Sequence, residues 1–452
     1  MFSRHSTAPS RNARLRTCLA RAAAVVVLLG MAAGCGAGSA LQAGQPPVPA
    51  SWRSYAQTQG QALRTIDPEA ADSSDLTFLA PALQDRRIVA LGESGHGVAE
   101  FSQAKFRLVK YLHEQLGYDV LAFESSMLSC YLGDESMGEL NPADVMRNSV
   151  FSVWSTTDVA KLFAYIQSTR GTTHPLTLAG FDIQVGTERE LAARPAIFRD
   201  LVAQIDPAYA PQVFDMDAAF TQNFRRKAYI RANAAALKPK YEALASFLDV
   251  HMAELQSAYA NRPLLPLVAR QAAWGMSAYL DQLSASAAHH DATAYNGRDA
   301  AMAINVGVLA DRMYPGKKIM LWAHNAHIER DRAAVSGDEL SWTNMGHWLA
   351  QRYGATYFAL GLFMYQGVAA HNDRTLYGIA PAPGRSVEAL AHSTGAAYLF
   401  FDLAHPAPGE GAAWMSQPFT VRDWGNVPLT LVPRDQYDGV LVLDTVHPPQ
   451  YL

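Results

Sequence analysis

Arg87-Ile88-Val89-Ala90-Leu91-Gly92-Glu93-Ser94-Gly95-His96-Gly97-Val98-Ala99-Glu100-Phe101 is the segment from which the fold can be predicted. It begins with a short apolar run of strand composition. It is broken at Gly92, and an acid and an imidazole then stand among glycines. Apolar residues recur at helical spacing from Phe101 onward. A strand, a glycine-rich turn carrying Glu93 and His96, and a helix form the unit in which α/β proteins place reactive groups.

Further short apolar runs follow along the chain, separated mainly by segments of helical period. They lie at residues 120–123, 176–181, 318–323, 357–363, 397–401 and 439–443. Near-continuous apolar runs that alternate with helices are typical of a sheet buried on both faces, and such sheets are mostly parallel. We therefore predict an α/β fold with a mostly parallel sheet core flanked by helices.

One region interrupts this alternation. Residues from about 187 to 290 are rich in alanine, long in helical period and poor in strand signals, and they contain no internal repeat. The segments 241–259 and 267–283 are each predicted to be helical. We expect this region to be a helical insertion or lid within one α/β domain that spans residues 61–452.

The first 34 residues have the pattern of a bacterial export signal. Five arginines precede an apolar run at residues 22–30, which is too short to cross a bilayer. Met31-Ala32-Ala33-Gly34-Cys35 is similar to a lipobox, although Ala32 stands where leucine is usual. In such signals the cysteine becomes a lipidated N-terminus after cleavage.

Two outcomes of export remain open. Lipid on Cys35 would anchor the protein to a membrane of the bacterial envelope, and residues 35–60 would then be a flexible tether. Ordinary cleavage near Gly38-Ser39-Ala40 would instead release a soluble periplasmic protein. The pattern favours lipidation.

Charge and cysteine content narrow the possible partners. The 452-residue chain has a formal net charge of −4 at pH 7 and no basic patch with interleaved aromatics, so nucleic acid is not an expected partner. Cys18 and Cys35 lie in the signal region. Cys130 is the remaining cysteine, so no disulfide is expected inside the domain. A buried small hydrophobe is favoured for Cys130 over a catalytic thiol.

Polar residues gather where the apolar runs end. They are Glu93, His96, Glu124, Asp182, His324 and His327. The carboxyl ends of parallel strands lie together along one edge of a sheet. We therefore expect these residues, far apart in sequence, to converge on one cleft.

His96 can act as a general base if a carboxylate orients its other nitrogen, and Glu93 and Glu124 are the candidates for that role. Ser94 is not expected to be a nucleophile, because the Gly-x-Ser-x-Gly pattern requires glycine where His96 stands. Water activated by His96 fits better. Lys105, on the following helix, could stabilise an oxyanion or bind a substrate carboxylate, or it could be a solvated lysine.

His324 and His327 are three residues apart after an apolar run, so the two imidazoles could bind one metal ion. Two glutamates and three histidines would suit zinc, iron or manganese. The chain has neither a His-Glu-x-x-His motif nor a cysteine ligand cluster, so neither a metal nor another cofactor is expected. The alternative is an exported envelope protein that binds a metal or a haem-like ligand through His96, His324 and His327 without hydrolase activity.

Leu91-Gly92-Glu93-Ser94-Gly95-His96-Gly97-Val98-Ala99-Glu100-Phe101 is similar to the Gly-Glu-x-x-His-Gly-x-x-Glu-Phe signature of the erythromycin esterase family. Further matches occur in order between residues 85 and 445. They are Phe123-Glu124, Gly180-Phe181-Asp182-Ile183-Gln184, Arg298-Asp299-Ala300-Ala301-Met302-Ala303-Ile304-Asn305, Trp322-Ala323-His324-Asn325-Ala326-His327, Met345-Gly346 and Tyr437-Asp438-Gly439. Several ordered motifs are far more specific than any one of them.

The resemblance implies a hydrolase of carboxylic ester or lactone bonds, because known family members hydrolyse the lactone ester of macrolide antibiotics. It implies a histidine base acting on water without a required metal, in a cleft between an α/β core and a helical lobe. Carried over by motif, the catalytic residues are His96, Glu93, Glu124 and His324. The residues expected to bind the small-molecule ester are Lys105, which replaces an arginine of some members, and His327, Asp182 and Arg298.

Overall fold

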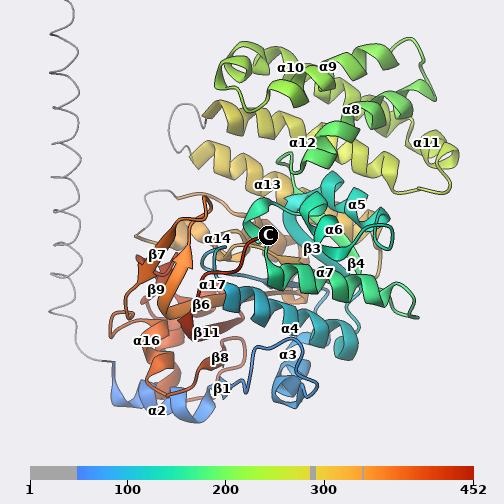
Figure 1. Ribbon diagram of the computed structural model, residues 1–452. Helices are drawn as coiled ribbons and strands as arrows, with labels where there is room; N and C mark the ends of the chain where they lie inside the picture. The colour runs from blue at the N-terminus through green and yellow to red at the C-terminus, as the bar shows by residue number, and fades with distance from the viewer. Residues whose placement is uncertain (1–47, 286–291, 338–340) are drawn as a thin grey trace, which may run out of the picture. The chain divides into compact units, whose positions relative to one another are not determined.

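A mixed nine-stranded sheet lies at the centre of this computed structural model, which describes residues 48–285, 292–337 and 341–452 (Figure 1). The strand order is β1-β8-β11-β6-β2-β5-β3-β4, and β7 pairs with β6 outside this path. The strands are β1 (Gln61–Ala62), β2 (Ile88–Leu91), β3 (Val120–Ser126), β4 (Thr177–Asp182), β5 (Ile319–Trp322), β6 (Tyr357–Ala370), β7 (Leu376–Ile379), β8 (Tyr398–Asp402) and β11 (Gly439–Val446).

The pairing from β11 across to β4 is parallel throughout, and β1, β7 and β8 add antiparallel pairs. Every apolar run predicted as a strand is one, so the predicted α/β fold with a mostly parallel sheet is confirmed. The strands could be predicted from apolar runs because β2 and β5 are buried along their whole length, which requires apolar residues on both faces. The β9 (Phe419–Asp423) and β10 (Val427–Leu431) hairpin was not predicted.

The strand register brings the expected site residues to one edge. Leu91, at the end of β2, is paired with Trp322 of β5, and Trp322 is paired with Phe123 of β3. Glu93 and His324 therefore lie just past the ends of β2 and β5, and Glu124 lies at the same level within the neighbouring strand β3.

Helices cover the sheet. On one face, α4 (Ala99–Leu116) and α7 (Thr157–Thr169) share an apolar core with the central strands. Gly117 ends α4 in the left-handed conformation, with φ 69°, which glycine adopts readily. Other helices are α3 (Ala80–Leu83), α5 (Met127–Glu135), α6 (Pro142–Ser149), α13 (Ala292–Val308), α14 (Asn325–Ile328), α15 (Met345–Tyr353), α16 (Val387–His392) and α17 (Pro433–Gln436).

The predicted insertion is a helical lobe, drawn from green to yellow in Figure 1. It comprises α8 (Glu188–Ala203), α9 (Ala210–Asn223), α10 (Lys227–Val250), α11 (Met252–Ala258) and α12 (Leu265–Ala285). The lobe has an apolar core of its own, in which residues such as Phe198, Phe220 and Tyr241 are fully buried. The chain leaves the sheet after β4 and returns through α13 to β5, so the lobe is inserted between two strands that lead into the site.

The folded region begins before residue 61. Residues 50–59, which the sequence pattern assigned to the end of the tether, form α2 (Ala50–Gln59) instead. Trp52 and Ala56 of α2 are buried, and the helix packs against the turn Glu410–Ser416. These two apolar residues are the reason that the segment folds. The predicted export signal and the rest of the tether, up to residue 47, lie outside the described residues. Within those residues, no helix combines the length and apolar character that a membrane span requires.

Candidate active site

The turn between β2 and α4 holds Glu93 and His96 together. His96 Nδ1 lies 2.7 Å from Glu93 Oε1, and Trp154 Nε1 donates a hydrogen bond to the same oxygen at 2.9 Å. The glycines of this turn are required by close neighbours. A Cβ on Gly92 would lie 2.0 Å from Asn325 Oδ1, and one on Gly97 would lie 2.0 Å from the Ala370 carbonyl oxygen.

Lys105 forms a buried ion pair with Glu93. Its Nζ lies 2.5 Å from Glu93 Oε2 and 4.0 Å from the centre of the Trp322 ring, and its side chain is 0% exposed. Lys105 is therefore not the solvated lysine that one hypothesis proposed. Burial lowers its pKa to about 8, although Glu93 and Glu124 oppose that effect.

Glu93 is ionised in this setting. Burial alone would raise the pKa of the Glu93 carboxyl, but the charge of Lys105 and the hydrogen bond from His96 outweigh it and hold the pKa below its ordinary value. An ionised carboxylate only accepts hydrogen bonds, so His96 Nδ1 carries a proton and donates it to Glu93. In the neutral form of His96, Nε2 then keeps its lone pair, and 13% of the His96 side chain is exposed.

A second network surrounds Glu124 of β3. Arg298 Nη2 donates to Glu124 Oε1 at 2.8 Å, and the backbone N–H of His324 donates to Oε2 at 2.9 Å. Arg298 also pairs with Asp182, through Nε at 3.2 Å and through Nη2. Burial would raise the pKa of Glu124, but His327 and Arg298 hold it well below its ordinary value.

His327 is the second cation of this network. Its Nδ1 lies 2.8 Å from Asp299 Oδ1, and its Nε2 lies 3.2 Å from Glu124 Oε1. Burial would lower its pKa, yet Asp299 and Glu124 raise it to about 10 and outweigh the nearby charge of Arg298. Both ring nitrogens of His327 are therefore protonated at neutral pH.

The contacts of His327 bear on the metal hypothesis, because each of its ring nitrogens already faces a carboxylate, Asp299 at Nδ1 and Glu124 at Nε2. Across residues 48–285, 292–337 and 341–452, no group of three or more His, Cys, Asp or Glu side chains has the arrangement of a metal site. The donor set of His96, His324 and His327 therefore does not favour the alternative of a metal- or haem-binding protein.

His324 begins α14 and lies beside His96. The Ala326 backbone N–H donates to His324 Nδ1 at 3.2 Å, so the proton of the neutral ring is on Nε2. Burial, followed by the charges of His96 and His327, lowers the His324 pKa well below its ordinary value. The ring centres of His324 and His96 are 5.3 Å apart. The arrangement thus places a neutral N–H donor next to a free imidazole lone pair.

All eight predicted site residues are brought together, but the four expected to bind substrate contact mainly other residues of the site. Lys105 pairs with Glu93, while Asp182, Arg298 and His327 pair around Glu124. These four side chains are buried, at 9% exposure or less. Their expected contact with a substrate therefore remains a prediction, and what the structure shows is that they hold Glu93 and Glu124 in place.

The sequence pattern missed several side chains at the site. Trp154 precedes α7, Asp423 ends β9 and Trp424 lies in the β9–β10 turn, with Asp423 Oδ1 3.4 Å from His324 Nε2. The Trp424 ring is 5.6 Å from the ring of His324, stacked, and 5.6 Å from that of His96, edge-on. None of these three follows an apolar run that was predicted. Asp299, by contrast, directly follows Arg298 in the family-like motif of residues 298–305, so the sequence could have indicated it.

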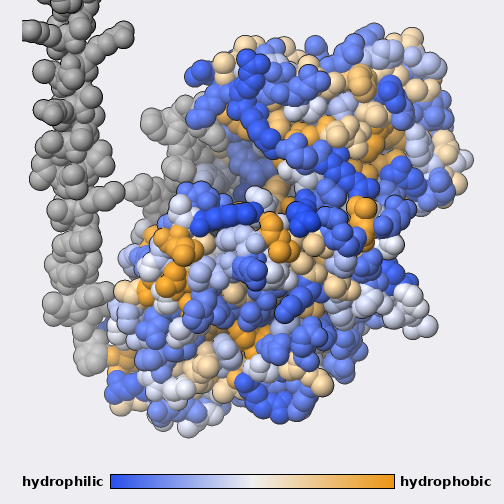
Figure 2. Space-filling model, viewed as in Figure 1, coloured by the Kyte–Doolittle hydropathy of each residue, from blue (hydrophilic) through white to orange (hydrophobic). Residues whose placement is uncertain are grey.

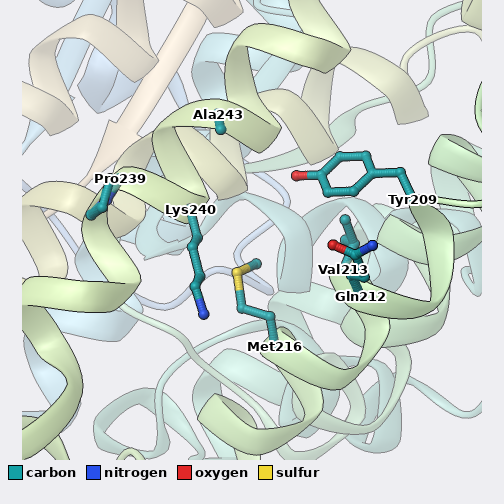
Figure 3. A pocket seen from close by; sticks show the side chains of 7 residues that line it. All are labelled: Tyr209, Gln212, Val213, Met216, Pro239, Lys240 and Ala243. Carbon is teal, nitrogen blue, oxygen red and sulfur yellow. The ribbon is translucent and has the colours of Figure 1, made fainter.

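Two other features, Cys130 and a groove on the helical lobe, contribute no reactive side chain to this site. Cys130 is buried and its thiol donates to the Ser149 carbonyl at 3.3 Å; burial raises the pKa of the thiol well above its ordinary value. A groove of about 300 Å³ lies on the helical lobe between α9 and α10 (Figure 3). Side chains including Tyr209, Met216 and Lys240 line it, without a carboxylate or an imidazole.

Comparisons with known proteins agree with the sequence motifs. The family model for erythromycin esterase matches residues 113–446, a range that begins after the turn with Glu93 and His96. A "Putative hydrolase YbfO" of Bacillus subtilis is 30% identical over 407 residues, which cover 85% of this chain and 89% of that one. An "Erythromycin esterase type I" of Escherichia coli is 26% identical over 313 residues, covering 64% of this chain and 72% of that one. The solved structure of a mutant of the erythromycin esterase EreC, in its open conformation, has a similar fold. It aligns with a TM-score of 0.68 at 19% identity, over 87% of this chain and 99% of that one.

Proposed function

The chain belongs to the erythromycin esterase family and is a hydrolase of the erythromycin esterase type, and we propose that it hydrolyses a carboxylic ester or lactone with water activated by His96. The observation that carries this proposal is the 2.7 Å contact between His96 Nδ1 and the ionised Glu93. In neutral His96 this contact leaves Nε2 unprotonated. Of the imidazoles placed at the site, that of His96 has the partly exposed side chain.

The proposed reaction has two steps. His96 Nε2 removes a proton from water, and the resulting hydroxide adds to the carbonyl carbon to form a tetrahedral oxyanion. The C–O bond to the leaving alcohol then breaks, and the His96 imidazolium returns the proton to that alkoxide. The products are a carboxylic acid and an alcohol, which for a lactone are two ends of one molecule.

His324 supplies the donor for the oxyanion in this proposal. Its Nε2–H is buried beside His96 and makes no hydrogen bond within the described residues, although Asp423 Oδ1 lies 3.4 Å away. Burial lowers the pKa of His324 well below its ordinary value, so the neutral ring can donate from Nε2 without taking the proton that His96 removes from water. Glu124 holds the backbone N–H of His324 and acts by positioning it.

The direct test is His96→Asn, assayed on a panel of macrolide lactones and simple esters by the gain of one water in mass. We expect kcat to fall by about 10²–10⁴-fold, the usual contribution of a general base. His405→Asn is the matched control, since the His405 side chain is 58% exposed and pairs with Asp402 far along the chain from the site. Wild-type hydrolysis that persists in His96→Asn would contradict the mechanism.

We also propose that the chain is exported and anchored through lipid on Cys35. The support is the N-terminal sequence, with its basic segment, apolar run and lipobox-like motif. Wild type and Cys35→Ala would be compared by membrane fractionation and by mass spectrometry of the N-terminal peptide. A soluble wild-type protein cleaved near residue 40 would contradict the anchor.

A further inference from the structure

The β9–β10 turn is joined to the catalytic turn through Trp424. The Trp424 backbone N–H donates to the Ser94 carbonyl at 2.6 Å, and the Tyr377 hydroxyl donates to the Trp424 carbonyl at 3.0 Å. Trp424 has φ 49°, a left-handed conformation that is unfavourable for a residue with a large side chain and that neighbouring contacts must hold. The indole is thereby fixed against the rings of His96 and His324.

Trp424 also lines a cavity of about 640 Å³ between the β6–β7 and β9–β10 hairpins. The other lining residues include His371, Asp373, Tyr377, Asn426 and Val427. The His371 and Tyr377 rings stack with centres 4.2 Å apart. This volume lies within the range of about 300–1,000 Å³ that is usual for small-molecule sites.

The lining combines flat aromatic faces with polar groups. Val427 of β10 is 43% exposed, and two further exposed hydrophobic residues, Val368 and Leu376, lie on the β6–β7 hairpin. Figure 2 shows hydrophobic side chains gathered where β7 and β9 lie in Figure 1. Aromatic and apolar walls bind ring systems by contact area, while Asn426 and Asp373 can bind hydroxyl groups.

We propose that this cavity is the subsite for a bulky, ring-bearing acyl or alcohol part of the ester, and that Trp424 connects the subsite to the catalytic imidazoles. The proposal rests on the proposed function, since it assigns the substrate class of the same site. The Trp424 ring centre is 5.6 Å from that of His96 and 6.4 Å from that of His371 in the cavity wall, so a group attached to an ester at His96 has to extend past one indole to enter the cavity. Remote binding of this kind raises kcat/KM for bulky esters and does nothing for small ones.

The test blocks the cavity with Val427→Trp. Three substrates are compared in a pH-stat assay: methyl butyrate, 2-naphthyl butyrate and methyl 2-naphthylacetate. We expect kcat/KM for at least one naphthyl ester to fall at least about tenfold, while the value for methyl butyrate stays within about twofold. Equal effects on all three substrates, or no effect on either naphthyl ester, would overturn the proposal.

Two controls keep this result interpretable. Val250→Trp makes the same change at a position that is 78% exposed on α10 and does not line the cavity, so it should alter no substrate's rate. Val427→Phe is a smaller block for the case in which Val427→Trp lowers the melting temperature.

The subsite can also be tested without turnover. If wild type hydrolyses no ester, the proposed function fails on its own, and calorimetric titration of 2-naphthol and 2-naphthylacetate then tests the cavity separately. Binding to wild type that weakens at least about tenfold in Val427→Trp supports the subsite. The absence of binding of both probes to wild type, or equal binding to the variant, would overturn it.

Discussion

Replacing Glu93 by glutamine separates the catalytic part of Glu93 from its structural part. The substitution keeps the size of the side chain and removes its charge. Lys105, which is fully buried 2.5 Å from Glu93 Oε2, then loses its counter-ion, and His96 Nδ1 loses its carboxylate. Both stability and activity should fall, for two different reasons.

The structure bounds the loss of stability. Breaking one side of a buried ion pair destabilises a protein by about 3–5 kcal/mol. Lys105 can escape by losing its proton, because its pKa is already lowered to about 8 with Glu93 in place. Neutralising a lysine with the ordinary pKa of 10.5 at pH 7 costs about 5 kcal/mol, which agrees with the upper end of that range.

A double variant distinguishes the two roles. Glu93→Gln with Lys105→Met removes the uncompensated cation, so the free energy of unfolding in urea should return to within about 2 kcal/mol of wild type. Ester hydrolysis should stay about 10²–10⁴-fold below wild type, because His96 still lacks the carboxylate that fixes its tautomer and stabilises its imidazolium. Recovery of hydrolysis together with stability would refute the reasoning, since Glu93 would then act only as the partner of Lys105.

Three further predictions follow from single contacts. His324→Phe keeps a ring at that position but removes the Nε2–H donor, so kcat should fall by about 10²–10³-fold with a small change in KM; an unchanged kcat argues against the donor role. His327 has its pKa raised to about 10, so its stabilising contribution is fully present below pH 6.5 and is lost as pH rises through 10. The difference in unfolding free energy between wild type and His327→Gln should therefore shrink between pH 6.5 and 10 in urea titrations, and a constant difference contradicts the pairing. Gly97→Ala would place a Cβ 2.0 Å from the Ala370 carbonyl oxygen and should destabilise the fold by about 1–3 kcal/mol, measured by thermal unfolding, unless the β6 extension can move.

Local patterns in the sequence were enough to predict the central sheet. Strands such as β2 and β5 are covered on both faces and must be apolar at every position, so they stand out from segments of helical period. The convergence of Glu93, Glu124 and His324 was also predictable, because parallel strands bring their carboxyl ends to one edge. The short hairpin β9–β10 was not, since β9 mixes buried and half-buried residues, β10 is mostly exposed, and both lie outside the central sheet.

The sequence by itself thus determined which residues meet, namely an acid and an imidazole in a glycine-rich turn and the polar residues after neighbouring strands. Only the tertiary structure decided what each of them does. From the sequence alone, Lys105 could be a solvated lysine and His327 could be a metal ligand. The structure shows Lys105 buried against Glu93, and Asp299 and Glu124 at the two ring nitrogens of His327. Trp424 had no signal in the sequence, because it contacts both imidazoles from a turn that lies 100 residues after His324 and 328 residues after His96. The protonation of a side chain and the partner that it contacts depend on burial and on charges that the fold brings close. A local sequence pattern does not show how close those groups lie.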